Sequence, residues 1–310
     1  MRAWEVVGSG SVLAVRDNER RGEPLLLLHG GPGVPDSLQA SVAPLLPGLR
    51  CISFDQRGVG KSRCDDGRYA LASYLEDIEA VRQACGLEAW HVLGHSFGGL
   101  LAQAYAARHP DRVKSLVLSS SSLGVNGDWR TTKRESFRIE RRRAGIRGAA
   151  RFYFYGSWLV LGGPVRDPGM RHLMTEVWHN YFLDPRAAPD PEPAWLAGAS
   201  AQAMIGTDRA MSHEDPAVLD GVSSYGGPIL VLYGEYDIFG PQVQAIVRRR
   251  LPQTTQVTHV TLQGSGHLHW LQNGEGYREA LATFFAKGPD GGQTVRRASV
   301  GDSRAARMEG

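Results

Sequence analysis

The fold of this chain is decided by residues 90–108, which read WHVLGHSFGGLLAQAYAAR. The stretch begins with an apolar run typical of a buried strand and ends with an alanine-rich run typical of a helix. Between them, residues 94–98 form a G-x-S-x-G pattern with Ser96 at its centre. Glycines two residues before and after the serine allow a sharp strand-to-helix turn that exposes the serine hydroxyl. The stretch therefore predicts that Ser96 is a nucleophile on such a turn.

Outward from this turn, short apolar runs alternate with segments of helical spacing along most of the chain. Continuously apolar runs are typical of strands buried on both faces, and strands that alternate with helices form parallel sheets. We therefore expect an α/β fold with a mainly parallel sheet covered by helices on both faces. The predicted strands are 12–15, 25–28, 51–54, 90–93, 113–118, 229–233 and 257–262, and the predicted helices are 74–85, 100–108, 241–250 and 276–286.

The alternation is interrupted in the middle of the chain, where helical tendency and proline-rich joints such as PDPEP at 189–193 replace it. We interpret residues 122–221 as an inserted, mostly helical cap on a core formed by 1–121 and 222–287. Residues 288–310 are rich in glycine, arginine and serine and have little apolar surface to bury, so a disordered tail is expected there.

The composition is that of an ordinary soluble globular protein, with 310 residues of which 42% are hydrophobic and 22% charged. A net charge of +3 is too small to indicate a nucleic acid or a membrane as partner. The three cysteines match no metal or redox spacing, and the N-terminus lacks the apolar run of a signal peptide. We expect a cytoplasmic protein that needs no metal or cofactor and acts on a small molecule.

A serine hydroxyl is a poor nucleophile near neutral pH, so a histidine must accept its proton. His267 ends the sequence GSGH, which directly follows the predicted strand 257–262. The loop after the last strand supplies the base in the α/β-hydrolase fold, whose strand–turn–helix serine motif this chain shares. His267 is therefore the expected base, and His269, two residues further on, is the rival.

The histidine in turn needs an acid that fixes its tautomer and stabilises the imidazolium. Asp237 lies in the loop between the predicted strand 229–233 and the predicted helix 241–250. Glu235 is the nearby rival. Serine, aspartate and histidine then follow one another along the chain in the order that the α/β-hydrolase fold requires.

The charge that develops on a carbonyl oxygen under attack needs hydrogen-bond donors. The N–H of Phe97, at the start of the helix that follows the nucleophile, is one expected donor. The second donor is expected from residues 29–33, HGGPG, because this loop follows a predicted strand and its glycines let N–H groups turn inward.

Five short motifs together resemble the proline iminopeptidase-like family of α/β-hydrolases over about residues 1–287. They are HGGPG at 29–33, DQRGVGKS at 55–62, GHSFGG at 94–99, GEYD at 234–237 and GSGH at 264–267. The resemblance implies a triad of Ser96, Asp237 and His267 and an oxyanion hole formed by the N–H groups of Gly31 and Phe97. It also implies that Asp55 and Arg57 brace the loop near the site.

The chain departs from this family where the aminopeptidases hold the substrate's amino group with acids. Ile238 follows Asp237, and Arg209 falls in the cap segment MIGTDRAM, residues 204–211, where relatives carry an acid. An isoleucine and an arginine cannot hold an ammonium, whereas Arg209 can pair with a carboxylate or phosphate on a substrate. We therefore expect activated esters or lactones to be cleaved better than prolyl arylamides. If the chain is an aminopeptidase, Asp208 and Glu214 are the remaining acids of the cap that could hold the substrate's amino group.

Two further features of the cap concern ligands. Its many aromatic residues, Trp178 among them, are expected to form the cap's own core and in part an apolar pocket for an acyl group. Residues 130–151 carry nine Lys or Arg and two acids. We interpret this segment as a solvated helix face, or else as a docking surface for an acidic partner such as a carrier protein that bears a thioester.

The sequence thus predicts a cofactor-free serine hydrolase that cleaves a small ester, lactone, thioester or amide through an acyl-enzyme on Ser96. One alternative is a proline iminopeptidase or related aminopeptidase. A further alternative is a non-hydrolytic lyase or cyclase on the same fold, because the same groups can move protons without forming an acyl-enzyme.

Overall fold

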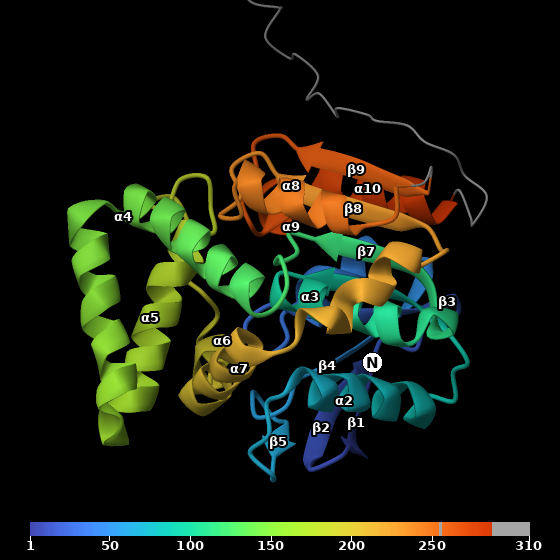
Figure 1. The fold of residues 1–310 in the computed structure, drawn as a ribbon, viewed down its shortest axis with the longest axis horizontal. Coiled ribbons are helices and arrows are strands. Elements are labelled where there is room, and N and C mark those ends of the chain that lie inside the picture. The colour runs from blue at the N-terminus through green and yellow to red at the C-terminus, as the bar shows by residue number, and fades with distance from the viewer. Residues whose placement is uncertain (254–255, 287–310) are drawn as a thin grey trace, which may run out of the picture.

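The computed structural model describes residues 1–253 and 256–286, so the predicted tail at 288–310 lies outside the described residues. Within this part of the chain a nine-stranded sheet forms the centre of the molecule (Figure 1). Its order is β1-β2-β4-β3-β6-β7-β8-β9, and β5 pairs with β2 outside this path. The strands are β1 Arg2–Val7, β2 Ser11–Asp17, β3 Glu23–Leu28, β4 Leu49–Phe54, β5 Arg63–Cys64, β6 Trp90–His95, β7 Val113–Ser119, β8 Ile229–Gly234 and β9 Val257–Leu262.

The strands from β4 to β9 along this order pair in parallel, whereas β2 pairs in antiparallel fashion with β1, β4 and β5. Successive side chains of β3 alternate between two apolar clusters, with Leu26 and Leu28 in one and Leu25 and Leu27 in the other. This is the pattern of a strand buried on both faces. The predicted α/β-hydrolase fold with a mainly parallel, doubly covered sheet is confirmed.

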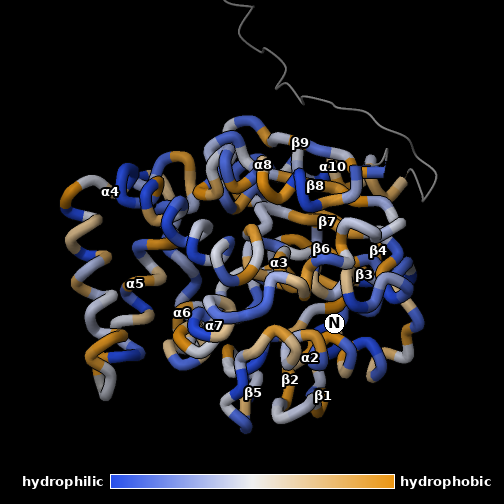
Figure 2. The backbone as a smooth tube through the Cα atoms, viewed as in Figure 1, coloured by the Kyte–Doolittle hydropathy of each residue, from blue (hydrophilic) through white to orange (hydrophobic). Residues whose placement is uncertain are grey.

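Helices cover each face of the sheet. One cluster includes side chains of α2 Leu71–Ala84, α3 Phe97–Arg108 and α8 Pro241–Arg250, and the other includes side chains of α1 Leu38–Ser41, α9 His269–Gln272 and α10 Gly274–Ala286. Figure 2 shows that apolar residues concentrate where the strands and these helices meet. Short 3-10 turns connect several of these elements, at Ala43–Leu45 and Pro110–Arg112 in the core, at Gly163–Val165 in the insertion and at Pro216–Ser224 before β8.

The helical insertion lies between β7 and β8 and projects to one side of the sheet (Figure 1). It contains α4 Gly127–Leu161, α5 Arg166–Asn180, α6 Pro193–Ala197 and α7 Ala201–His213. A third apolar cluster, which includes Leu159, Met170 and Leu173, holds these helices together. The boundaries of the cap at 122 and 221 stay a prediction, as does the docking role of the basic segment 130–151, which lies on α4.

The sequence reading missed β1, and the reason is its place at the edge of the sheet. Only Val6 of its six side chains is buried, so the strand lacks the apolar alternation that identifies a half-buried strand. By contrast, β9 and α8 begin and end at the residues expected from their apolar spacing.

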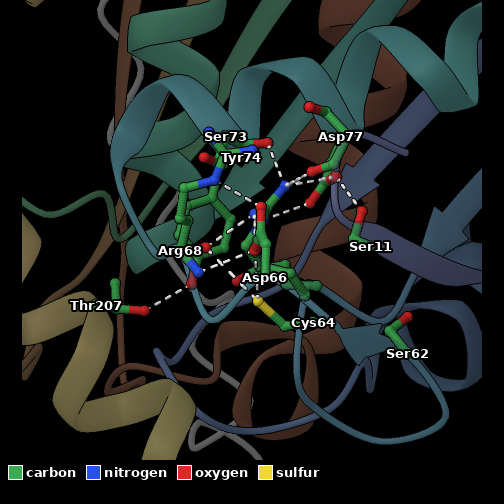
Figure 3. Close-up of polar contacts among 12 residues, drawn as sticks. Ser11, Ser62, Cys64, Asp66, Arg68, Ser73, Tyr74, Asp77 and Thr207 are labelled. Carbon is green, nitrogen blue, oxygen red and sulfur yellow. Dashed lines mark hydrogen bonds and ion pairs between the residues drawn. The ribbon is translucent and has the colours of Figure 1, made fainter.

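A buried arginine braces the loop that follows β4. Arg57 is fully buried and donates from Nε and Nη2 to the carboxylate of Asp77 on α2, at 2.8 Å each, and from Nη1 to the carbonyl of Arg68. Figure 3 shows Asp77 also facing Ser11, whose hydroxyl donates to it at 2.6 Å. Ion pairs of this kind leave each charge compensated, so Arg57 has a structural role.

Asp55 and Tyr74 make further hydrogen bonds that hold neighbouring segments in place. Asp55 accepts two hydrogen bonds from the Arg16 guanidinium and further ones from the amides of Asp36 and Lys61. The hydroxyl of Tyr74 on α2 bonds to that of Thr207 on α7 at 2.6 Å, as Figure 3 shows, and so ties the cap to the core. Neither Asp55 nor Arg57 lines the cavity described below.

Candidate active site

Ser96 occupies the turn between β6 and α3 with φ 55° and ψ −116°, in a region that residues with a side chain rarely adopt. The sequence pattern explains why the turn is possible. A Cβ on Gly94 would lie 2.2 Å from the carbonyl oxygen of Gly98, and a Cβ on Gly98 would lie 2.1 Å from that of Leu28. Both positions therefore require glycine, and the strained turn directs Ser96 toward the carboxyl end of the sheet.

Asp237 and His267 form a buried pair at the same end of the sheet. They follow β8 and β9, which are parallel neighbours. Nδ1 of His267 lies 2.9 Å from Oδ1 of Asp237, and neither side chain is exposed to solvent. Burial alone would raise the pKa of Asp237, but the interaction with His267 outweighs it and lowers that pKa to about 2. Asp237 is thus a carboxylate at neutral pH.

The other nitrogen of this histidine is available for chemistry. Nε2 of His267 is buried and has no hydrogen-bond partner among the residues that the structure describes. The alternative acid and the alternative base make other contacts. Glu235 is exposed and accepts a hydrogen bond from the N–H of Gly264, and His269 is hydrogen-bonded to Ser120. The contact between His267 and Asp237 is the one that the sequence motifs predicted.

Two contacts bring the histidine loop to the serine turn. His95, next to Ser96, has its ring centroid 4.7 Å from that of His267, and its Nε2 lies 3.1 Å from the His267 carbonyl oxygen. The histidine loop also contacts the cap. The backbone carbonyl of Tyr181 accepts a 2.8 Å hydrogen bond from the N–H of His267, and the Tyr181 ring centroid lies 4.6 Å from that of the imidazole. Burial lowers the pKa of His95 well below its ordinary value, so this ring is neutral.

The two expected oxyanion donors lie at one cavity. Gly31 and Phe97 both line it together with Ser96. Neither of their N–H groups donates a hydrogen bond within the part of the chain that the structure describes. Gly31 has a φ of 140°, which a side chain would disfavour, so the loop conformation depends on glycine there. Their role in stabilising an oxyanion stays a prediction.

The cavity has a volume of about 330 Å³ and lies between the core and helices α4, α5 and α7 of the cap. Most of its lining is apolar, which suits a small substrate whose reacting group is held by few polar contacts. Among the predicted substrate contacts, Ile238 and Trp178 line it. The side chain of Trp178 is fixed by a 2.8 Å hydrogen bond from Nε1 to the Pro189 carbonyl.

Arg209 does not lie where the sequence reading expected it. Its side chain is exposed on α7 and does not line the cavity, whereas its neighbour Asp208 does. Asp208 follows Met204 and Ile205 by four and three residues, so it shares their face of α7, and both of these residues also line the cavity. The prediction that Arg209 contacts the substrate is therefore corrected in favour of Asp208. Glu214 also lies elsewhere, at the end of α7, where it accepts from the N–H of Leu71.

Sequence reasoning missed a second acid in the cavity. Glu140 of α4 lines it and is 7% exposed. Burial raises the pKa of Glu140 to about 7, although nearby Arg143 opposes the shift. Asp208 differs, because Trp129 donates to it at 2.8 Å and Lys133 pairs with it. Glu140 lies in an arginine-rich segment whose charges predict a solvated helix face, so the sequence gives no signal that this acid is buried.

Comparisons with known proteins agree with the fold. A sequence model described as the α/β hydrolase fold matches residues 23–139. A proline iminopeptidase of Neisseria meningitidis is 29% identical over 255 residues, which cover 72% of this chain and 77% of that protein.

Two solved structures share the fold. A proline iminopeptidase of Mycobacterium smegmatis superposes with a TM-score of 0.67 at 22% identity, covering 92% of this chain and 98% of that one. An enol-lactonase of Burkholderia xenovorans superposes equally well, with a TM-score of 0.67 at 19% identity over 91% of this chain and 99% of that one. Among the helices of the described ranges, none has the length and apolar character needed to cross a membrane.

Proposed function

We propose that this chain, which has the α/β-hydrolase fold and is similar to proline iminopeptidases, is a serine hydrolase that works through an acyl-enzyme on Ser96. The substrate is a small ester, lactone, thioester or amide whose acyl part fits the apolar cavity. The hydrolase class follows from the family, and the triad and the substrate class are our proposal.

In this mechanism Nε2 of His267 accepts the Ser96 proton as the hydroxyl oxygen attacks the substrate carbonyl. The N–H groups of Gly31 and Phe97 stabilise the negative charge on the carbonyl oxygen. Asp237 stabilises the imidazolium, which then gives its proton to the leaving group. A water activated by the same histidine hydrolyses the acyl-enzyme. Hydrogen bonds between serine and base are often long in free enzymes and shorten around the substrate.

The observation that carries the proposal is the buried His267–Asp237 pair, with one imidazole nitrogen bonded to the carboxylate at 2.9 Å and the other without a partner in the described part of the chain. Asp237 stays ionised because its pKa is about 2, so it can hold His267 in the tautomer that presents an unprotonated Nε2.

The proposal is tested by trapping the intermediate. Mixing the enzyme with excess p-nitrophenyl butyrate should release a burst of nitrophenol close to one equivalent per active site. If no burst is resolved, enzyme quenched in the steady state should carry one butyryl group. Intact-mass spectrometry and peptide mapping should place that group on Ser96. Release of nitrophenol without any acylated Ser96 would mean that water or another group attacks the ester, and would contradict the acyl-enzyme on Ser96.

A second candidate function is aminopeptidase activity, and one observation favours it. The cap places two acids at the cavity, Glu140 and Asp208. The N-terminal ammonium of a peptide substrate would find a counter-charge there, which the sequence alone did not predict. Asp208 is already paired with Lys133, so Glu140 is the acid that is open to a substrate cation.

This candidate predicts a pH-dependent selectivity between pH 5.5 and 7.5. Because the pKa of Glu140 is about 7, its side chain is neutral at the lower end and becomes a carboxylate as the pH rises. The prolyl ammonium remains charged up to a pKa of about 8. The ratio of kcat/KM for Pro-p-nitroanilide to kcat/KM for a p-nitrophenyl ester of similar size should therefore rise with pH.

Both substrates depend on the same His267, so the ratio isolates the carboxylate. In Glu140→Gln the ratio should be lower by about tenfold at pH 7.5 and should no longer change with pH, which reflects one lost charge-assisted contact. An equal ratio in wild type and variant across this range would exclude Glu140 as the ammonium site.

A further inference from the structure

The residue after β7 makes a second side-chain contact with the acid of the site, besides that of the histidine. Ser120 is fully buried and has a φ of 47°, a conformation that a non-glycine residue adopts only where its surroundings hold it. Its hydroxyl donates to Oδ2 of Asp237 and lies 2.8 Å from Nε2 of His269. Because β7 lies between β6 and β8, Ser120 sits between the serine turn and the loop that carries Asp237.

The direction of these hydrogen bonds follows from the donors available. A carboxylate only accepts, so the single hydroxyl proton of Ser120 must point to Asp237. The short contact with His269 then requires that Nε2 of His269 carries a proton and donates to the Ser120 oxygen. Burial lowers the pKa of His269 to about 4, so this imidazole is neutral and has one N–H to donate.

We propose that Ser120 and His269 are positioning residues that hold the carboxylate of Asp237 in the orientation His267 needs. Oδ1 of Asp237 accepts from His267 and from the N–H of Phe239, and Oδ2 accepts from Ser120. With both oxygens engaged, the carboxylate cannot rotate away from the imidazole. This inference rests on the proposed serine-hydrolase function.

Removing the Ser120 hydroxyl has two consequences for His267. The carboxylate becomes free to rotate, which lowers the rate, and it gives up less of its charge to a hydrogen-bond donor, so more of that charge acts on the imidazolium. The groups that face this histidine are Asp237, the neutral ring of His95, and the rings of Tyr181 and Phe239. Arg143 acts on this histidine through Asp237, whereas His269 acts electrostatically on both His267 and Asp237 as well as through its hydrogen bond to Ser120.

The experiment measures kcat/KM for a p-nitrophenyl ester against pH. In Ser120→Ala the plateau should fall roughly tenfold to a hundredfold, the usual effect of one hydrogen bond to a charged group. The acidic limb should move to higher pH by several tenths of a unit. His269→Leu should lower the plateau and move the acidic limb in the same directions as Ser120→Ala, but by smaller amounts. His269→Gln, which keeps an N–H donor, should recover part of the loss.

Because His269 acts through Ser120, the double variant Ser120→Ala/His269→Leu should resemble Ser120→Ala alone. Ser121→Ala is the matched control, since Ser121 is equally buried but bonds to Gln103 rather than to the acid. Its pH profile should match that of the wild type.

Two results would overturn the inference. One is a Ser120→Ala profile with an unchanged plateau and acidic limb, and the other is a double variant whose losses simply add. A wild type whose ester turnover does not depend on Ser96 would overturn the proposed function and this inference with it. Melting temperatures of all variants separate these effects from loss of folded protein.

Discussion

Replacing Ser96 with alanine should lower kcat/KM for a p-nitrophenyl ester by about 10⁴-fold to 10⁶-fold, the usual loss when a triad member is removed. Without the hydroxyl no acyl-enzyme can form, and the remaining donors of the site only orient and polarise the substrate. Alanine has the same backbone preferences as serine at φ 55°, so the turn and the melting temperature should be nearly unchanged.

The control for this variant is Ser121→Ala, which removes a hydroxyl from a residue with equal burial that does not line the cavity. Its kcat/KM should stay within a few-fold of the wild type. A Ser96→Ala enzyme that retains a tenth or more of the activity would show that another group forms the bond to the substrate.

Replacing Arg57 with methionine should lower the free energy of unfolding by about 3–5 kcal/mol. The substitution keeps an apolar stem of similar length but leaves the carboxylate of Asp77 buried without its cation. The same burial already raises the pKa of Asp77 above its ordinary value, and loss of the arginine should raise it further. Urea denaturation followed by far-UV circular dichroism measures the difference.

The direction in which the stability of Arg57→Met changes with pH is a second check. In the variant, Asp77 has a higher pKa in the folded than in the unfolded chain, so folded protein loses stability as the pH rises above about 4. The deficit should therefore be smaller at pH 5 than at pH 8. Arg57→Met/Asp77→Leu, which removes both charges, should recover much of the loss. Equal stability of Arg57→Met and wild type at pH 8 would contradict the bracing role.

The sheet could be predicted from the sequence because its central strands are apolar without interruption. Leu25–Leu28 and Ile229–Tyr233 point to both faces of the sheet, and burial on both faces leaves no polar alternation to confuse with a surface strand. β1 could not be predicted in this way, because an exposed edge strand has no such pattern. Local sequence therefore identified the interior of the sheet better than its edge.

The pair Asp237–His267 was predictable because motif and topology agree. Each residue directly follows a strand, and parallel neighbours bring such loops together. The lining of the pocket was less accessible, since it depends on which side of a cap helix faces the core. A rotation of one residue along α7 replaces Arg209 with Asp208, and no periodic signal in one sequence fixes that rotation.

Ser120 and Glu140 show the same limit. Ser120 stands in a run of four serines, 119–122, and nothing in the run distinguishes the one whose hydroxyl meets Asp237. Glu140 is one of two acids among nine basic residues, yet it turns inward and is buried. The partner of Ser120 is distant in sequence, and the burial of Glu140 depends on how α4 packs, so only the tertiary structure identifies either feature.

The central claim, that Ser96 is the nucleophile activated by His267 and Asp237, is tested most directly with a fluorophosphonate probe. Such probes react with an activated serine and report its position after digestion and peptide mass spectrometry. The account predicts a single labelled site at Ser96, no labelling of Ser96→Ala, and labelling of Asp237→Asn that is slower by orders of magnitude. Labelling of a different serine, or labelling at an unchanged rate when Asp237 is replaced, would contradict it.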